Sequence, residues 1–313
     1  MVCTAWRTAI PGFLFLLATC SEASAAYVGD RFFPSTLATT VPTAADFYNP
    51  PYFVKLPDTA TTHETDIPST YSRLVTKDWA WTFTETFRIL DVANKGRLSG
   101  FDNLVIGTQY QLYTDAVHQF VFTVGGTAAL GGTGSSPVAA SFSTVTPTVY
   151  IGKGFGDLPD SMAWLQPLTI SATAAVAVPT DAYSLTSTAL PSGMTTLSET
   201  VNPKILQLGF ALEYSLVANM YTGANRTGTR YPEGWVPLVE FTTATPLNGP
   251  LAGKTTGTVN PGFIWVNRFL QVAVEAIVPM DAHSGRDLGV RAQAHLYLPA
   301  IFPDFYGKPI FGK

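Results

Sequence analysis

One stretch of sequence restricts the possible folds of this chain more than any other: residues 205–221, ILQLGFALEYSLVANMY. Even positions from Leu206 to Leu216 are apolar or aromatic, whereas the odd positions include Gln207 and Glu213. Alternation with period two places the apolar side chains on one face of a strand. The stretch exceeds the roughly 5 to 6 residues of an ordinary strand and suffices for the roughly 9 to 11 residues of a tilted membrane-crossing strand. It favours a membrane β-barrel, and a long strand of a soluble barrel or sandwich is the alternative.

The composition supports a barrel over a helical membrane protein. Charged residues make up 13% of the 313 residues, hydrophobic residues make up 46%, and the mean hydropathy is +0.19. Beyond the first residues, however, no apolar run approaches the roughly 18 residues of a membrane-spanning helix. The formal net charge of -4 indicates neither a polyanion-binding protein nor an acidic tail. The chain is therefore apolar overall without helical spans.

The first residues, 1–26, have the pattern of a secretory signal peptide: a basic residue, an apolar run and an A-x-A end. We expect cleavage near Ala25 or Ala26. Both cysteines, Cys3 and Cys20, lie in this segment, so the mature chain is predicted to contain neither a disulfide nor a reactive thiol. A lipid anchor at Cys20 is disfavoured because a threonine precedes it where a small Gly or Ala is usual.

Residues 27–76 are rich in Pro, Thr and Asp and show no sustained period, which predicts an extended N-terminal arm. Two placements are open. The arm plugs the lumen of the barrel, or it lies as a periplasmic segment against the barrel mouth, and the sequence slightly favours the second.

From residue 77 to residue 299 strand patterns alternate with turns, and they predict an all-β, transmembrane, antiparallel up-and-down barrel of about ten strands, with twelve as the alternative. The predicted strands are 79–90, 101–113, 118–130, 138–151, 164–178, 205–221, 234–243, 260–266, 269–279 and 287–298. Residues 300–313 are predicted to form a C-terminal tail.

Connection lengths predict how the barrel is oriented. If both termini are periplasmic, the short connections 114–117 and 267–268 are periplasmic turns, and the long segments 179–204 and 244–259 are extracellular loops. This orientation also places every tryptophan of the mature chain at a periplasmic strand end, where amphipathic rings favour the headgroup level. These residues are Trp79, Trp81, Trp164, Trp235 and Trp265.

Polar residues between the apolar positions are predicted to face the lumen: Gln207, Glu213, Glu240, Gln271, Glu275, Arg291, Gln293, His295 and Tyr297. The last connection is centred on His283, so residues equidistant from it oppose one another in an antiparallel hairpin. Glu275 then lies opposite Arg291, and Gln271 opposite His295. We predict a cross-strand ion pair, and the alternative is two charges solvated separately in a wet lumen.

Four segments carry a resemblance to a known family: FFPSTL at 32–37, GKGFGDLP at 152–159, SGR at 284–286 and GKPIFG at 307–312. The chain resembles uncharacterised proteobacterial outer-membrane barrels that are labelled as transporters of the phenol-degradation MetA-pathway type. The resemblance implies a Gram-negative outer-membrane location and passage of small molecules, hydrophobic or aromatic solutes among them. It supplies no catalytic residue.

No motif in the sequence predicts a cofactor, a metal site or nucleic-acid binding. The glycine-rich segments 152–156 and 253–255 depart from the nucleotide-binding patterns, and the four histidines lack metal-ligand spacing. The leading function is therefore a narrow, porin-like channel or transporter whose partners are outer-membrane lipid, the barrel-assembly machinery and an unidentified small solute. A structural or surface-interaction barrel without transport is the first alternative. A membrane-embedded hydrolase using His295 is less favoured because no matching serine is evident, so we predict that the protein is not an enzyme.

Overall fold

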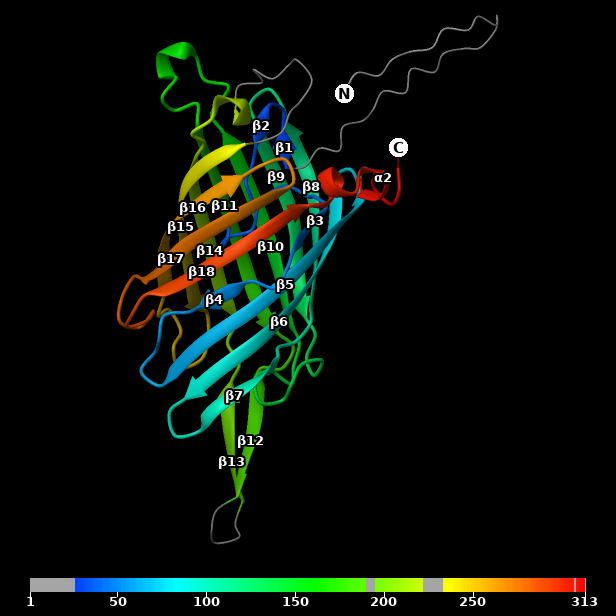
Figure 1. Cartoon of the computed structure of the whole chain (residues 1–313). Helices are drawn as coiled ribbons and strands as arrows, with labels where there is room; N and C mark the ends of the chain where they lie inside the picture. The colour runs from blue at the N-terminus through cyan, green and yellow to red at the C-terminus, as the bar shows by residue number, and fades with distance from the viewer. Residues whose placement is uncertain (1–25, 190–194, 222–232, 307, 313) are drawn as a thin grey trace, which may run out of the picture.

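Antiparallel strands follow one another around a closed barrel in the computed structural model of this chain (Figure 1). The structure describes residues 26–189, 195–221, 233–306 and 308–312. Two short strands, β3 and β4, lie end to end between β18 and β5 and pair with both, and β5 pairs with β6. The last strand is thereby joined to the first strands. Closure of this kind leaves no free edge in the wall.

The wall has twelve strand positions, one of them shared by β3 and β4. In chain order they are β3 (Phe47–Asn49) with β4 (Phe53–Lys55), β5 (Thr62–Thr76), β6 (Trp79–Val92), β8 (Val105–Asp115), β9 (Phe120–Ala129), β10 (Thr144–Gly154), β11 (Leu168–Pro179), β14 (Ile205–Tyr214), β15 (Gly234–Pro246), β16 (Thr256–Val266), β17 (Leu270–Pro279) and β18 (Gly289–Tyr297).

Short elements lie outside the wall positions. They are β1 (Tyr27–Val28), β2 (Arg31–Phe32), β7 (Gly96–Phe101), β12 (Tyr183–Ala189), β13 (Thr195–Val201), the 3-10 helices η1 (Asp160–Met162) and η2 (Ala218–Met220), and the helices α1 (Leu298–Ile301) and α2 (Pro303–Tyr306). No helix among the described residues is long and apolar enough to cross a membrane.

The predicted all-β, antiparallel up-and-down barrel is confirmed, with the alternative count of twelve strands. All ten predicted strands correspond to wall strands. The two further positions come from residues 47–76, so the prediction of an arm extending to residue 76 is wrong for β3, β4 and β5. In β5, charged residues and Pro68 interrupt any apolar stripe, and Pro50 with Pro51 separates β3 from β4. The structure places residues 26–46 alone in the arm.

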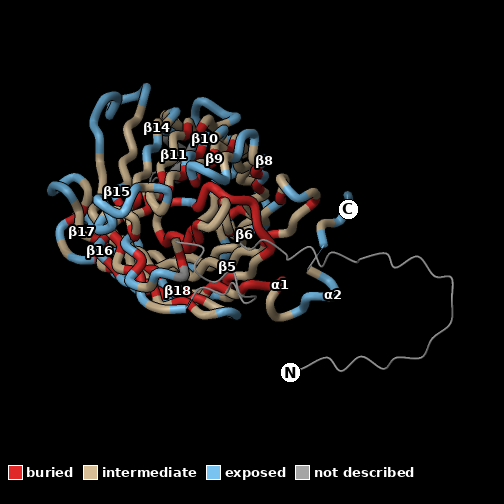
Figure 2. The backbone as a smooth tube through the Cα atoms, turned by 90° about the horizontal axis from the view of Figure 1, so that it is seen from above, coloured by how far each residue is buried: buried red, intermediate tan, exposed pale blue. Residues whose placement is uncertain are grey.

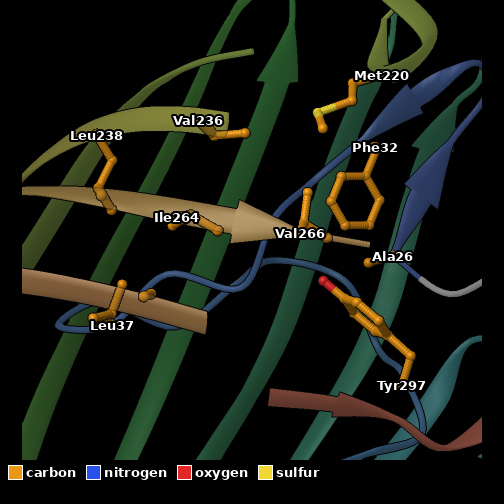
Figure 3. Packing of buried hydrophobic residues seen from close by; sticks show 10 residues of the cluster. Ala26, Phe32, Leu37, Met220, Val236, Leu238, Ile264, Val266 and Tyr297 are labelled. Atoms are coloured by element: carbon orange, nitrogen blue, oxygen red, sulfur yellow. The ribbon is translucent and has the colours of Figure 1, made fainter. Parts of the chain in front are cut away.

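The stretch 205–221 is not one long strand, which corrects the sequence prediction. β14 ends at Tyr214, and the backbone N–H of Ser215 then bonds the carbonyl of Pro167. At the end of η2, Met220 is fully buried beside Phe32 at one end of the barrel (Figure 3). Its apolar side chain therefore packs against the arm instead of continuing the outer face of the strand.

The two faces of the wall differ in polarity. Large apolar side chains are exposed on the outside, among them Tyr110, Leu112, Val149, Ile151, Leu208, Phe263, Val272 and Val274. Polar side chains alternate with them and are buried inside, including Gln109, Thr123, Ser171, Glu240, Asn260, Gln271 and Glu275. This arrangement, apolar outside and polar inside, is the inverse of a soluble barrel and matches a transmembrane one.

The two ends of the barrel also differ. β1 and α2 lie at one end, here called the terminal end, and the β6–β7 and β12–β13 hairpins extend from the other, here called the loop end (Figure 1). The short connections after β8 and β16 lie at the terminal end, and the long 179–204 and 244–259 segments contain the loop-end connections. The prediction that these sets lie on opposite sides is confirmed. Residues 155–167, and the described residues 215–221 that follow β14, also lie at the terminal end.

Candidate functional site

The arm, residues 26–46, lies inside the ring of strands and fills part of the lumen. Most of its residues are buried, although Thr40 is exposed, and Figure 2 shows buried backbone enclosed by the wall in a view along the barrel. Apart from β1 and β2 it has no regular structure, so its backbone N–H and C=O groups need other partners. Polar side chains of the wall supply many of these partners.

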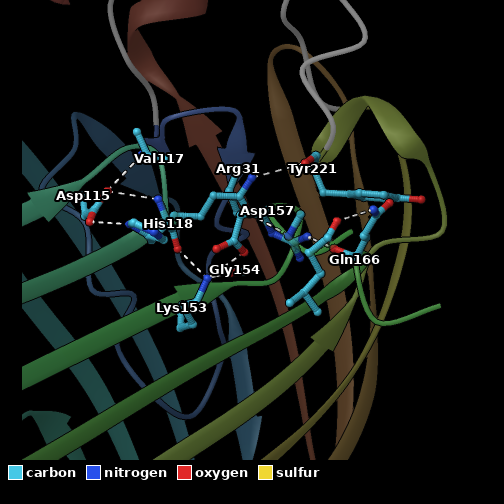
Figure 4. A network of polar contacts seen from close by, with 12 residues as sticks. Arg31, Asp115, Val117, His118, Lys153, Gly154, Asp157, Gln166 and Tyr221 are labelled. Carbon is cyan, nitrogen blue, oxygen red and sulfur yellow. Dashed lines mark hydrogen bonds and ion pairs between the residues drawn. The ribbon is translucent and has the colours of Figure 1, made fainter. Parts of the chain in front are cut away.

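At the terminal end, Arg31 holds the arm in place. Its guanidinium donates to the carbonyl oxygens of Gln166, at 3.1 Å, and Pro167, at 2.8 Å, and it lies 5.8 Å from the centre of the Tyr221 ring. Figure 4 shows Arg31, Gln166 and Tyr221 together with Lys153 and Asp157, which form an ion pair at the same end of the barrel. A fully buried guanidinium is stable only with such partners.

Beside Arg31, an apolar cluster seals the same end (Figure 3). Phe32 is fully buried and packs against Val266 and Tyr297, with its ring centre 6.1 Å from that of Tyr297. Burial of one aromatic side chain of this size contributes about 1.5 to 3 kcal/mol. The cluster therefore fixes the arm at the terminal end without any covalent link.

Glu240 binds the innermost part of the arm, residues 37–39, which we call the arm tip. Its carboxylate accepts hydrogen bonds from the backbone N–H groups of Leu37 (3.0 Å), Ala38 (2.7 Å) and Thr39 (2.9 Å), and from the Thr39 hydroxyl (2.7 Å). Bonds to an ionised acceptor are about twice as strong as neutral ones. One buried wall carboxylate thus determines how deep the arm reaches.

Other wall residues bind the arm on both sides of its tip. The Gln271 side chain accepts from the backbone N–H of Ser35, at 3.0 Å, and donates to its carbonyl oxygen. On the return toward the terminal end, Gln111 accepts from the N–H of Ala44 at 2.8 Å, and Arg73 pairs with Asp46 at 2.7 Å. The arm therefore enters at the terminal end, turns at Glu240 and returns to β3.

Two glycines of β10 make room for the arm. A Cβ at Gly152 would lie 2.6 Å from Pro42 Cγ and 2.8 Å from Phe33 Cε1, and a Cβ at Gly154 would lie 2.6 Å from Arg31 Cγ. Real Cβ atoms essentially never approach other atoms so closely. The glycine-rich segment that fails as a nucleotide motif thus has a packing role in the lumen.

The predicted hairpin register of β17 and β18 is confirmed. Glu275 lies opposite Arg291 and Gln271 opposite His295, and Arg291 Nη1 is bonded to Glu275 Oε1. His295 is buried, with Nδ1 2.7 Å from Asn49 Oδ1 and its ring stacked on Phe47. These contacts give the histidine a structural environment at the junction of β18 and β3.

The other sequence-predicted residues are placed as follows. Glu213, Glu240, Gln271, Glu275, Gln293, His295 and Tyr297 are buried, Arg291 is partly buried, and Gln207 is exposed near the loop end. The five tryptophans Trp79, Trp81, Trp164, Trp235 and Trp265 lie toward the terminal end, Trp235 directly opposite Trp265.

Sequence reasoning missed several polar residues. Asn260, directly opposite Glu240, and Arg88, which forms ion pairs with Glu64, Asp66 and Asp102, are among them. Asn260 shares the period-two positions of Thr258 and Gly262 in β16, so its inward orientation could have been predicted from the sequence. The Arg88 cluster depends on recognising β5, whose mixed faces conceal it.

A cavity of about 520 Å³ lies on the loop-end side of the arm tip. Its lining includes Ala38 of the arm tip, Asn260 and Arg291 of the wall, and apolar side chains near the loop end, Leu56 and Ile277. The volume falls within the roughly 300 to 1,000 Å³ of small-molecule sites. This cavity, closed on one side by the arm tip, is the candidate site. In the described ranges, no group of three or more His, Cys, Asp or Glu side chains is arranged to hold a metal ion.

No protein-family model matches the sequence, and no curated protein matches it either. Among solved structures, the chain is similar to an outer membrane channel from Pseudomonas putida F1, with a TM-score of 0.49, 10% identity, and coverage of 84% of this chain and 99% of that one. It is also similar to the KdgM porin, with a TM-score of 0.46, 10% identity and coverage of 80% and 98%. For the NanC porin the TM-score is 0.45, the identity 8% and the coverage 80% and 98%. The assignment as a barrel rests on the strand pairing of this chain itself.

Proposed function

We propose that this protein is a bacterial outer-membrane barrel that conducts small molecules along a lumen narrowed by its own arm. The observation that carries the proposal is the combination of an apolar outer face with a polar interior containing both the arm and a cavity of about 520 Å³. In this proposal both termini are periplasmic, after removal of a signal peptide that lies almost entirely outside the described residues. The tryptophan belt then lies at the periplasmic headgroup level.

Because the arm occupies the lumen, the barrel cannot form a permanently open pore of large diameter. Solutes that enter the cavity from the loop end meet the arm tip, whose bonds to Glu240 hold it across the lumen. Passage requires the arm tip to shift. The predicted conductance is therefore small, and it increases when the arm is released.

An engineered disulfide tests this proposal. A Cβ at Gly209 would lie 3.4 Å from Thr39 Cβ, close to the roughly 3.5 to 4.5 Å separation in disulfides. In Gly209→Cys/Thr39→Cys protein, oxidation should lock the arm tip to β14 and abolish conductance in planar bilayers and solute uptake in liposomes. Reduction should restore both.

The single Thr39→Cys variant is the matched control because it lacks the Thr39 hydroxyl bond but cannot form the link. It should conduct equally under oxidising and reducing conditions. Identical conductance of the oxidised and reduced double variant would contradict passage past the arm tip.

A structural or surface-interaction barrel is the second candidate, and two observations favour it: the arm occupies the lumen, and the β12–β13 hairpin projects from the loop end (Figure 1). Absence of conductance and uptake in every redox state would support this candidate. We propose no catalytic role for His295, whose described contacts are with Asn49, Phe47 and Tyr297. Ester hydrolysis that is abolished by His295→Ala would overturn that view.

Assignment to the phenol-degradation type of transporter rests on the sequence resemblance. Liposome uptake of phenol compared with that of a hydrophilic solute of equal size tests it, and preferential uptake of phenol would support it.

A further inference from the structure

The C-terminal tail, residues 300–313, leaves the wall and lies against its outer side. It begins within α1 and continues through α2, and both helices lie outside the ring of wall strands in a view along the barrel (Figure 2). The backbone N–H groups of Ile310 and Phe311 bond the carbonyl oxygens of Leu74, at 3.2 Å, and Val75, at 2.8 Å. These bonds attach the tail to β5 at the terminal end.

The strand to which the tail is attached has an arginine on its outward face. Arg73 lies directly opposite Trp81 of β6, whose side chain is 40% exposed on the outer face. The preceding residue, Ser72, points the other way, because its hydroxyl donates to the carbonyl oxygen of Ala45 in the arm. Charge on the lipid-facing side of a membrane barrel is unfavourable. The arginine therefore needs a cover on that side.

The tail supplies this cover. Arg73 Nη2 donates to the carbonyl oxygens of Phe305, at 3.2 Å, and Lys308, at 2.9 Å, and the guanidinium carbon lies 5.0 Å from the centre of the Tyr306 ring. Together with the ion pair to Asp46, these contacts leave the arginine side chain only 12% exposed. The tail thus presents its polar backbone groups to the wall.

Large apolar side chains of the tail remain uncovered. Phe302, Phe305, Ile310 and Phe311 are 55%, 65%, 53% and 66% exposed. Single exposed apolar residues are ordinary, but a group of four within ten residues indicates an interaction surface. Because the tail lies against the outer face of β5, these side chains extend the apolar outer face of the wall.

The position of the tail along the barrel is that of the tryptophan belt. Trp79 and Trp81 lie on β6 directly opposite the part of β5 that the tail covers. Lys308 in the tail and Lys77 in the turn between β5 and β6 are exposed. Aromatic rings and lysines together are typical of the headgroup level of a bilayer, where an apolar side chain reaches the acyl chains and an ammonium stays in water.

We propose that the C-terminal tail is a phospholipid-binding surface that lies in the leaflet at the terminal end. Its exposed apolar side chains insert just below the headgroups, as in interfacial membrane anchors, while its backbone covers Arg73. This inference rests on the outer-membrane location in the proposed function and extends it to a segment outside the wall. It also gives the lipid a contact with the arm, because the covered arginine pairs with Asp46.

The test measures the depth of nitroxide labels on the mature chain, residues 27–313, in nanodiscs of phosphatidylethanolamine and phosphatidylglycerol with one barrel per disc. Both native cysteines precede residue 27, so a single introduced cysteine is the only thiol. Labels at Phe305→Cys and, in a separate variant, Phe311→Cys should collide more often with molecular oxygen, which is enriched among acyl chains, than with a water-soluble nickel complex. Electron paramagnetic resonance measures both collision rates.

Three labelled variants provide the scale. Leu208→Cys, on the outer face of β14, marks lipid, and Glu199→Cys, exposed on β13 outside the barrel, marks water. Asp304→Cys is the matched control within α2, because its polar side chain is exposed beside Phe305 and its label should meet the nickel complex more often. Circular dichroism should show all variants folded.

Two results would overturn the inference. Labels in the tail that meet the nickel complex as often as the label at Glu199→Cys would place the tail in water. Labels that meet neither reagent would show that protein, not lipid, covers these side chains. If the label at Leu208→Cys also behaves as in water, the barrel itself is not in the bilayer, and the failure belongs to the proposed function.

Discussion

At the scale of single residues, Glu240 has the largest number of bonds to the arm and is the residue through which its position is most easily changed. A glutamine at this position presents an NH₂ group where the carboxylate accepts backbone N–H donors. We expect Glu240→Gln to increase amide hydrogen exchange in residues 35–41 by at least about tenfold, equivalent to losing about 1.4 kcal/mol of local stability. Mass spectrometry of peptides from the arm measures this change.

Glu199→Gln serves as the control for Glu240→Gln because Glu199 is exposed on β13, outside the barrel. Exchange in residues 35–41 should match the wild type in this control. If Glu240→Gln also leaves exchange unchanged, the carboxylate does not hold the arm tip.

The Glu275–Arg291 pair provides a second residue-scale prediction. The Glu275 side chain is fully buried and that of Arg291 is 15% exposed, so removing one partner leaves a poorly compensated charge. Glu275→Gln and Arg291→Gln should each lower the free energy of unfolding in denaturant by up to about 3 to 5 kcal/mol. The double variant should be little worse than either single one. Additive losses would show that the two side chains do not stabilise each other.

At the scale of elements, the arm and β10 are predicted to fit together only because β10 has glycine at two inward positions. Gly152→Leu should displace Phe33 and Pro42, loosen the arm and raise single-channel conductance. Gly96→Asn is the control, since no atom lies within 4 Å of a Cβ there and Asn tolerates the positive φ of 78°. A conductance equal to that of wild type in Gly152→Leu would mean that the arm accommodates the larger side chain.

A contact at the loop end links the β4–β5 connection to the β17–β18 connection and predicts a pH dependence. The backbone N–H of Asp58 and the Lys55 ammonium lower the pKa of Asp287. A lowered pKa means that the link stabilises the loops above the unfolded pKa of about 3.9 and is lost as pH falls through the folded pKa. Hydrogen exchange in residues 56–61 should therefore increase on acidification, after correction for intrinsic rates.

Asp287→Asn should remove this pH dependence and should make residues 56–61 exchange faster at neutral pH than in wild type. An unchanged pH profile in the variant would assign the effect to another group.

At the scale of the whole molecule, the polarity of the two faces predicts where charge is tolerated. Leu208 is exposed on the outer face, where Arg costs about 2 to 4 kcal/mol near the membrane midplane. Leu208→Arg should therefore reduce folding into bilayers. Its neighbour Gln207, exposed near the loop end, should accept Arg with little loss. Equal losses from both variants would mean that the faces are assigned incorrectly.

Ala211 also belongs to β14, but it should tolerate arginine far less well than Gln207. Ala211 is completely buried, directly opposite Glu240. An arginine there overfills a lumen that the arm already occupies, so we expect it to be strongly destabilising.

Closure of the wall predicts resistance to denaturation by detergent. Every wall strand is paired on both sides, so no edge is free to open first. Unboiled protein should migrate differently from boiled protein on SDS gels. Identical migration, or solubility without detergent, would contradict a transmembrane barrel.

The sequence by itself determined the repeated part of the wall and the register of its last hairpin. In strands such as β14, β17 and β18, successive side chains face the outside and the interior of the barrel in turn. Apolar and polar residues therefore alternate in the sequence with a period of two. The Glu275–Arg291 register follows from the same local rule, because a connection centred on His283 fixes which residues oppose one another.

Only the tertiary structure decided the closing strands and the place of the arm. β5 has charged residues among its intermediate positions and no apolar stripe, and β3 becomes a strand by pairing with β18, whose residues are far away in the chain. The arm, likewise, is held by Glu240 and Gln271, about two hundred residues later. Such bonds leave no local period in the sequence, because each depends on a partner that only the closed barrel brings within reach.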